Sequence, residues 1–321
     1  GQGLYVGIAE DRFIVASEPY GVVEETMRYV RMDGEALSDA NNPSSRGQVI
    51  VLDGDIAGTV NGMSMLAYDG TDLGLNESHV AIAEVTTRDI DRGEHKHFLA
   101  KEIGEAPASF RKTLRGKIGE RDGNLFASLD TSVVPQRVID ALSAGKIARI
   151  RVIGQGTAAI AGRSLVQLLR TLVDHRVQVD ALPATELSGF QLQLDMSDTL
   201  VIAISQSGTT TDTNRTVDLA RSRGASVLAI VNRRGSELAA KADGVLYTSD
   251  GRDVEMSVAS TKAFYSQVSA GALLACALSS ALGSGTDAAR HQLLTALRTV
   301  PDAMNRVLEM RPQIAQAARQ F

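Results

Sequence analysis

The residues best suited to chemistry lie in 199–213, with the sequence TLVIAISQSGTTTDT. The first part is a continuous apolar run, which predicts a central strand of a parallel sheet buried on both faces. Five hydroxyl side chains and one amide follow around Gly208, and a polar-faced helical segment comes next. The free N–H groups and the dipole at a helix start favour a phosphate, and hydroxyls can donate to its oxygens. The pattern predicts a site for a small phosphorylated ligand held by neutral donors.

A loop of this composition has two other interpretations besides a phosphate site. A Ser/Thr-rich loop that only caps a helix needs one hydroxyl rather than five. A Walker loop needs the pattern GxxxxGK[ST], which this segment lacks. Thr209, followed three residues later by Asp212, predicts a capping box at the start of the helix.

A second glycine-containing turn, GQGTAA, occupies residues 154–159. It fits the dinucleotide fingerprint GxGxxA, and Asp180 closes the next predicted strand, where a ribose-binding acid would lie. This fingerprint is weak by itself, and a dinucleotide site does not need the hydroxyl-rich loop after the third strand. A dinucleotide-binding fold remains the main rival interpretation at this point.

The elements that must position these residues alternate between strands and helices. The predicted strands are residues 149–156, 176–182, 199–205, 226–232 and 245–249. Their alternation with helical segments predicts an α/β fold with a doubly wound, five-stranded parallel sheet. A long helix over residues 260–281 follows, and then two amphipathic helices divided at Pro301.

The N-terminal part of the chain is turn-rich and has the pattern of strands. Residues 4–9 and 13–18 predict a hairpin, and residues 29–35 and 49–60 predict a further pair of strands. From residue 97 to 118 the pattern becomes helical, and Pro107 predicts a break into two helices.

Three motifs resemble one family. SQSGTTTDT is similar to the SQSG[ED]TxDT signature of sugar isomerase (SIS) domains, in particular the first such domain of glutamine–fructose-6-phosphate amidotransferases, or glucosamine-6-phosphate synthases. VASTKAF, at residues 258–264, is nearly identical to a motif of that family, and HFLAKEIGEAP, at 97–107, resembles its HxMxKEIxEQP linker helix. The motifs occur in the family's order, which favours the SIS interpretation over the dinucleotide fingerprint.

The resemblance implies a domain organisation. Residues 1–95 resemble the β-rich C-terminal part of a glutaminase (Ntn-type) domain, 96–130 a helical linker, 131–286 the SIS domain, and 287–321 helices leading toward a second SIS domain. The chain lacks an initiating Met and begins with a strand-like pattern, so we expect it to be cut from a longer protein.

The resemblance also assigns substrate-binding residues. It places the phosphate on Ser205, Gln206, Ser207 and Thr210, and the hydroxyl-bearing carbons of the sugar on Val258 and Ser260; Thr157 matches the family's Gly-Thr turn. Gln155 and Ala158 replace the Cys and Ser of that turn, which removes one donor to the phosphate. From the residues alone, Ser260 could equally be a helix N-cap.

The activity implied by the resemblance converts fructose 6-phosphate and glutamine to glucosamine 6-phosphate and glutamate, toward UDP-GlcNAc, without metal or organic cofactor. The family's nucleophilic N-terminal cysteine, enolisation base, ring-opening His and imine-forming Lys match no residue here. We therefore expect no catalytic residue on this chain, no activity from it alone, and a structural role for Lys262. The alternative is a non-catalytic sugar-phosphate sensor, although the chain shows no basic helix-turn-helix pattern.

Other titratable residues carry weaker signals. His95 and His97 lack a third ligand at metal-binding spacing, so no metal is expected. Glu255 and Asp253 precede a predicted helix, where acids favour the dipole. Cys276 lies within an apolar run, which indicates packing, and a single cysteine fits a reducing cytoplasm.

Charge and hydropathy limit the class of partner. The formal net charge of −5 argues against nucleic acid or an anionic membrane surface. No apolar run approaches the roughly 20 residues that span a bilayer. The C-terminal helices carry apolar residues with no following domain to cover them, which predicts a homodimer; they are Leu293, Leu294, Leu297, Val307 and Leu308.

Overall fold

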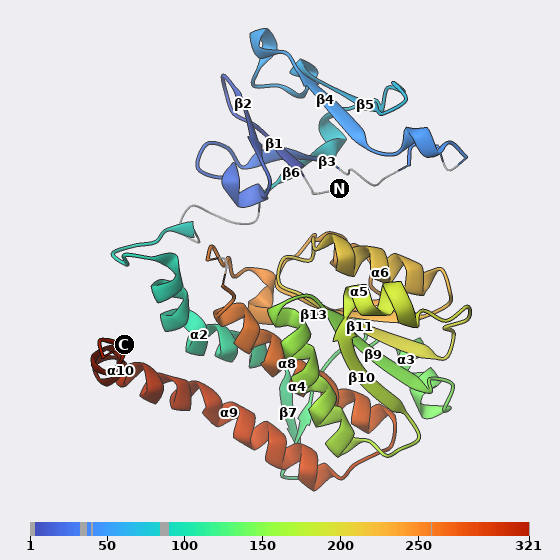
Figure 1. The fold of residues 1–321 in the computed structure, drawn as a ribbon, viewed down its shortest axis with the longest axis vertical. Coiled ribbons are helices and arrows are strands. Elements are labelled where there is room, and N and C mark those ends of the chain that lie inside the picture. The colour runs from blue at the N-terminus through green and yellow to red at the C-terminus, as the bar shows by residue number, and fades with distance from the viewer. Residues whose placement is uncertain (1–3, 33–36, 40, 84–89, 258, 321) are drawn as a thin grey trace. The chain divides into compact units, whose positions relative to one another are not determined.

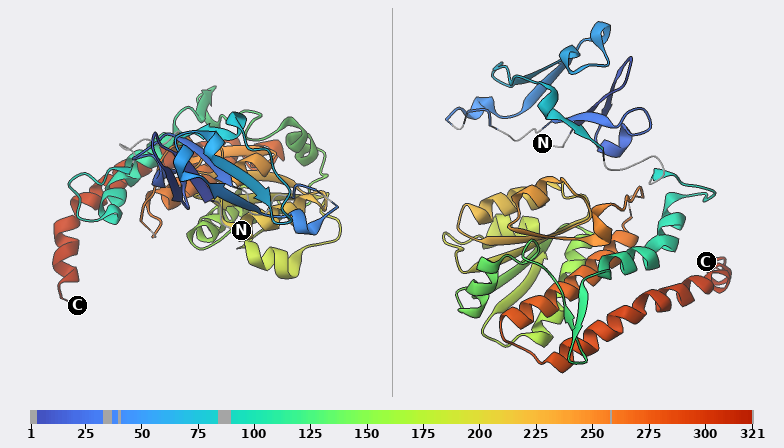
Figure 2. Two further views of the ribbon diagram at one scale, coloured as in Figure 1. Left: turned by 90° about the horizontal axis from the view of Figure 1, so that it is seen from above. Right: turned by 180° about the vertical axis from the view of Figure 1, so that it is seen from behind.

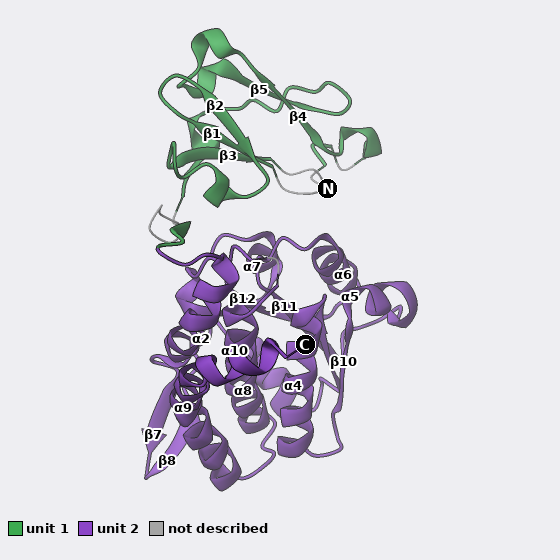
Figure 3. Ribbon diagram, turned by 60° about the vertical axis from the view of Figure 1, so that its left-hand side comes forward, with its two compact units in different colours: residues 1–93 green, residues 94–321 purple. Residues whose placement is uncertain are grey.

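The structure is a computed structural model that describes residues 4–32, 37–39, 41–83, 90–257 and 259–320. The chain divides into two compact units, Gly1–Gly93 and Glu94–Phe321 (Figure 3). Each unit is described separately. None of the helices within the described residues combines the length and apolarity needed to cross a membrane.

The second unit is built on a five-stranded parallel sheet, which confirms the predicted α/β, doubly wound fold (Figure 1). Its order is β10-β9-β11-β12-β13, and every neighbouring pair runs parallel. The strands are β9 (Arg149–Gly154), β10 (Gln178–Pro183), β11 (Thr199–Ser205), β12 (Ser226–Val231) and β13 (Gly244–Tyr247).

The central strand β11 has an apolar sequence because both faces of the sheet are covered there. Ile202 and Ile204 pack into one core with α4 (Thr157–Leu172) and α8 (Lys262–Ala281). Val201 and Ala203 pack into a second core with α6 (Thr211–Arg221) and α7 (Glu237–Lys241). Burying a side chain such as Ile202 completely stabilises the fold by about 1.5–3 kcal/mol.

The remaining α-helices of this unit border these two cores, except the last of them, which has no buried residue. They are α2 (Phe98–Leu114), α3 (Gln136–Ser143), the short α5 (Ala184–Glu186) with the π-helical η6 (Leu187–Gln191), α9 (Asp287–Glu309) and α10 (Arg311–Ala318). Helix α2 lies against α8, and the long α9 lies beside the hairpin formed by β7 (Ile118–Arg121) and β8 (Asn124–Ala127) (Figure 2).

Two predicted helix breaks are wrong. Helix α2 continues through Pro107, and α9 continues through Pro301 and ends only at Glu309. Both prolines are buried. A proline removes one helical hydrogen bond, and the packing of these helix faces compensates for that loss.

The region expected to be a helical linker contains a β-hairpin after α2. Strands β7 and β8 pair antiparallel around Asp122 and Gly123, whose φ angles are +51° and +76°. Two consecutive positive φ angles are typical of the tight hairpin turn that Asp-Gly favours. The buried Leu125 fixes the hairpin in the core of this unit, and its N–H donates to His291 Nδ1 at 3.0 Å.

The first unit is β-rich. A four-stranded antiparallel sheet has the order β2-β1-β3-β6, with β1 (Leu4–Ile8), β2 (Phe13–Ala16), β3 (Arg28–Met32) and β6 (Val80–Ile82). The predicted first hairpin is confirmed by the pairing of β1 with β2.

The second predicted strand pair of this unit is wrong. Strand β3 pairs with β1 and β6, whereas β4 (Gln48–Leu52) pairs with β5 (Met63–Ala67). The shared core decides the pairing, because Val30 lies opposite Val6 in the register and both pack with Met63 and Met65.

Candidate functional site

The candidate site lies at the topological switch point of the five-stranded sheet. The chain passes from β9 outward to β10 and then returns to β11 on the other side of β9. Ligands of open α/β sheets bind in the crevice beyond the carboxyl ends of such strands. A cavity of about 190 Å³ lies there. It is lined by Gln155, Thr157, Ala158, Ile204, Ser205, Gln206, Ser207, Thr210, Glu255, Ser257, Ser260 and Gln267.

The loop after β11 forms one wall of the cavity, and its own hydroxyls hold its shape. The Gly208 N–H donates to Ser205 Oγ at 3.0 Å, and Ser205 Oγ lies 3.3 Å from Thr210 Oγ1. Ser207 Oγ accepts from Thr209 N–H at 3.2 Å and from Thr209 Oγ1 at 2.9 Å. Gly208 has a φ of +68°, the left-handed region that favours glycine.

The start of α6 differs from the predicted capping box. Thr210 is the N-cap and makes no side-chain cap hydrogen bond. The Thr209 hydroxyl donates to Ser207 Oγ instead, so the pairing with Asp212 is wrong. Asn214 holds the loop from behind, because its amide nitrogen donates to the carbonyls of Gly208 and Thr210 at 3.1 Å. Within the described part of the chain, Thr210 leaves the first N–H groups of α6 uncapped, as an anion site requires.

The turn after β9 forms the adjoining wall. Gly156 has a φ of +55°, and α4 begins at Thr157 without a side-chain cap. The Gln155 amide nitrogen lies 3.3 Å from Thr185 Oγ1 and 3.4 Å from Asp212 Oδ2. Thr157 and Ala158 both line the cavity, and the side chain of Ala158 carries no hydrogen-bond donor.

The opposite wall consists of the segment before α8. Glu255 accepts from Ser260 Oγ at 2.9 Å, and from Thr261 N–H at 2.7 Å and Thr261 Oγ1 at 3.1 Å. Helix α8 has Thr261, not Ser260, at its N-cap position, so Ser260 is not a cap. Ser260 lines the cavity while its hydroxyl donates to Glu255, and the Glu255 carboxylate accepts from the N–H groups at the start of the helix. Val258 lies outside the described residues.

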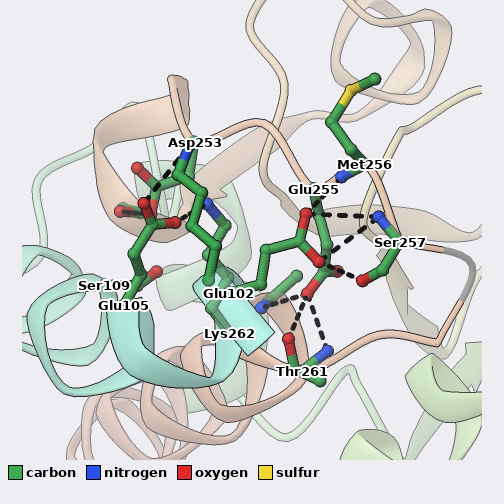
Figure 4. A network of polar contacts seen from close by, with 12 residues as sticks. Glu102, Glu105, Ser109, Asp253, Glu255, Met256, Ser257, Thr261 and Lys262 are labelled. Atoms are coloured by element: carbon green, nitrogen blue, oxygen red, sulfur yellow. Dashed lines mark hydrogen bonds and ion pairs between the residues drawn. The ribbon is translucent and has the colours of Figure 1, made fainter. Parts of the chain in front are cut away.

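Helix α2 supports this wall (Figure 4). The Glu102 carboxylate, on a residue only 1% exposed, accepts from the N–H groups of Met256 and Ser257. Glu105 forms an ion pair with Lys262 at 2.6 Å, which agrees with the structural role expected for this lysine.

Sequence reasoning missed Ser257 and Gln267, which line the cavity, and Glu102, which supports its wall. Glu102 belongs to the HFLAKEIGEAP motif, but nothing local in the sequence shows that its carboxylate reaches residues 256 and 257. Gln267 lines the cavity, and its Oε1 is buried with no hydrogen-bond partner within the described residues. Its only signal was its place on the helix that follows the VASTKAF motif.

Asp253 stabilises the same segment near its start. Burial would raise the pKa of Asp253, but hydrogen bonds from Ser249 and Ser109 and the charges of Lys112 and Lys262 hold this pKa below its ordinary value. Its carboxylate is therefore an anion that anchors the segment.

The other candidate residues lie apart from the cavity. His95 and His97 are exposed, and no cluster of three metal-binding side chains occurs in the described ranges. Asp180 forms ion pairs with Arg151 and Arg170, so it does not present the free acid of a ribose site.

Two expectations for the C-terminal helices have different outcomes. Cys276 is buried, which raises the pKa of its thiol to about 11 and fits the predicted packing role. Leu294 and Leu297 pack into the core of their own unit, so the expectation that nothing covers them is wrong. Val307 remains 57% exposed.

Comparison with known proteins identifies a matching family and similar proteins. Residues 145–277 match the SIS domain family. The chain is 32% identical over 308 residues to a glutamine–fructose-6-phosphate aminotransferase (isomerizing) of Corynebacterium diphtheriae, covering 95% of the chain and 44% of that protein. It is also 32% identical over 280 residues to the Thermus thermophilus protein of the same name, covering 87% and 43%.

A solved structure agrees. The C-terminal domain of glucosamine-fructose-6-phosphate aminotransferase from Francisella tularensis superposes with a TM-score of 0.61 and 25% identity, covering 71% of this chain and 60% of that one. The chain spans less than half the length of the curated relatives named above.

Proposed function

Because residues 145–277 form a SIS domain and most of the chain is related to glutamine–fructose-6-phosphate aminotransferases, we propose that it is the sugar-phosphate-binding, isomerase-side portion of such an enzyme. The observation that carries the proposal is the cavity at the switch point, lined by neutral donors from the loop after β11 and by the turn before α4.

The ligand of this site is fructose 6-phosphate or glucosamine 6-phosphate. Ser205, Gln206, Ser207 and Thr210 hold the phosphate, together with Thr157 and the N–H groups at the start of α6. By resemblance, Ser260 and Val258 contact the hydroxyl-bearing carbons of the sugar. The buried Oε1 of Gln267 offers an acceptor for a sugar hydroxyl.

The contribution of these residues to the reaction is binding and orientation. Contacts to a remote phosphate supply binding energy that positions the reacting carbons of the sugar. In the parent reaction, which serves amino-sugar biosynthesis, those carbons undergo amination and isomerisation. Acid–base and imine chemistry belong by resemblance to residues that this sequence does not contain.

Calorimetry tests the ligand. Fructose 6-phosphate should bind, whereas free fructose should bind at least about tenfold more weakly, since one charge-assisted hydrogen bond contributes about 1.5–3 kcal/mol. The double variant Ser205→Ala/Ser207→Ala should lose binding. Ser222→Ala, on an exposed serine at the far end of α6, is the control. Equal affinity for sugar and sugar phosphate would exclude a phosphate site.

Enzyme assays test the proposed division of labour. We expect these 321 residues alone neither to hydrolyse glutamine nor to form glucosamine 6-phosphate. Turnover of either substrate by a sample whose intact mass shows a single species would contradict this.

Assembly as a homodimer is also proposed. Exposed apolar side chains follow one another along the end of α9 and into α10, at Val307, Met310 and Ile314. Exposed apolar groups of this kind are typical of interfaces. Light scattering at micromolar concentration should give the dimer mass, and a monomer mass would exclude the dimer.

A further inference from the structure

We propose that Glu102 of α2 is a positioning residue of the sugar-phosphate cavity. Its carboxylate fixes the backbone at Met256 and Ser257, so that ligand binding and the docking of α2 are thermodynamically linked. The inference rests on the proposed function of the cavity and adds a determinant that lies outside it.

The contacts of Glu102 are those of a side chain that orders a loop. Oε1 accepts from Met256 N–H at 2.5 Å and from Ser257 N–H at 3.2 Å, and Oε2 lies 3.3 Å from Ser257 N and also accepts from Ser257 Oγ (Figure 4). Hydrogen bonds to an ionised acceptor are about twice as strong as neutral ones. A carboxylate buried without them would be costly, so the segment and the helix require each other.

These contacts reach the cavity through one residue. Ser257 lines the cavity, as does Glu255 two positions earlier. Glu255 in turn holds Ser260 and Thr261. Glu102 and Glu255 therefore restrain neighbouring parts of the same wall. Glu102 does so from α2, which is far away along the chain, and Glu255 from within the segment itself.

Further polar pairs join α2 to α8. Glu105 pairs with Lys262 at 2.6 Å, and the hydroxyls of Ser109 and Ser266 lie 2.8 Å apart in the buried contact between the helices.

Helix α2 also follows directly after the boundary between the two units, at residues 93 and 94. The helix that orders one wall of the cavity is thus the element that connects the unit to the chain before it. By linkage, whatever stabilises this wall also stabilises the docked helix.

The variant Glu102→Gln tests the inference in the full chain. It is nearly isosteric, but its NH₂ group cannot accept from Ser257. We expect about tenfold weaker binding of fructose 6-phosphate, the loss of one charge-assisted hydrogen bond. We also expect faster hydrogen exchange at Met256 and Ser257 in the ligand-free protein, with exchange in β11 unchanged. Because linkage is reciprocal, we also expect slower hydrogen exchange in α2 when fructose 6-phosphate binds.

Glu105→Gln is the matched control. It changes a more exposed carboxylate on the same helix and leaves the contacts to Met256 and Ser257 in place. Its affinity should stay within about twofold of the unsubstituted chain. An equal loss of affinity in both variants would mean that general docking of α2 matters rather than the Glu102 contact, and would overturn the inference.

Ser257→Ala keeps the test decisive if Glu102→Gln does not fold. It removes the hydroxyl that donates to Glu102, which also lies 3.0 Å from the carbonyl oxygen of Ala259, and it should weaken binding about three- to tenfold. Unchanged affinity in either folded variant overturns the inference. Failure of the unsubstituted chain to bind any sugar phosphate would contradict the proposed function instead, and the exchange rates at Met256 and Ser257 would still decide whether Glu102 orders the wall.

Discussion

The two walls of the cavity are held by different kinds of contact. The side-chain hydrogen bonds within the wall at 205–210 join residues close in sequence, such as Gly208 to Ser205 and Thr209 to Ser207, and the backbone N–H groups of Asn232 and Leu238 add contacts from the next segment of the sheet. The wall at 255–261 depends in part on Glu102, which lies on a helix far away along the chain. One short segment thus supplies most of the side-chain donors proposed to bind the phosphate, whereas the wall proposed to orient the sugar depends on a carboxylate from a helix far away along the chain.

The largest expected effect comes from breaking the local wall with Gly208→Ala. An added Cβ would lie 2.5 Å from Ser236 Cβ, at a backbone φ of +68°. The left-handed conformation and the overpacking together should lower the free energy of unfolding by about 2–4 kcal/mol. Binding of fructose 6-phosphate should be lost. Urea unfolding and calorimetry measure the two effects.

Gly104→Ala is the control for that substitution. Gly104 lies inside α2, and a Cβ there would meet nothing within 4 Å. Because glycine is unfavourable in a helix interior, this variant should gain about 0.5–1 kcal/mol of stability. Similar effects of both variants would show that the loop after β11 does not require its observed shape.

The second expected effect concerns the other wall, through Glu255→Gln. The carboxylate accepts from Ser260, Thr261 and the N–H of Ala263 at the start of α8. Loss of its charge should lower the free energy of unfolding by about 1–2 kcal/mol. Urea unfolding measures this, and Glu120→Gln, on an exposed carboxylate, is the control. Equal stability of the two variants would show that the Glu255 charge contributes nothing.

The same contrast explains what the sequence could predict. The five strands of the parallel sheet are predictable because they alternate with helical segments, and the central strands β11 and β12 are also nearly continuous apolar runs. The four residues predicted to bind the phosphate all lie at the end of β11 or in the loop after it, and Thr157, which follows the neighbouring strand β9, lines the same cavity together with Ser260. These patterns are local, so residue order alone reveals them.

The errors arose where distant contacts decide. Pro107 and Pro301 were expected to break helices, but tertiary packing retains both. The pairing of β3 was assigned to a nearby segment, although the shared core with β1 selects its neighbour. Glu102 could not be predicted for the same reason, because its partners are defined only by the docking of α2. The Asp122-Gly123 hairpin, by contrast, carried a local signal that was overlooked.

The third expected effect comes from adding a hydrogen-bond donor to the cavity. Ala158 lines the cavity on the α4 side, where the family resemblance expects a serine. Ala158→Ser should improve the binding free energy of fructose 6-phosphate by about 1 kcal/mol, the contribution of one net hydrogen bond. Ala159→Ser places the same hydroxyl one position along the helix, on a residue that does not line the cavity, and should leave affinity unchanged. Calorimetry that shows no gain for Ala158→Ser would mean that the phosphate does not reach this turn.

The smallest expected effect is a difference in acid response between the walls. The wall after β11 consists of neutral hydroxyls, whereas Asp253 stabilises the other segment as an anion, paired with Lys112 at 3.1 Å. Its pKa in the folded protein lies below the ordinary value of 3.8. Asp253 therefore contributes stability that is present above the unfolded pKa and is lost as pH falls through the folded pKa.

Urea unfolding of the ligand-free protein, in steps from about pH 5 to pH 3 across the usual carboxyl range, should show a steeper loss of stability for the unsubstituted chain than for Asp253→Asn. The ligand is left out because its phosphate titrates too. Parallel pH profiles would show that Asp253 does not anchor this wall, and would leave Glu102 and Glu255 as the carboxylates that distinguish it from the phosphate loop.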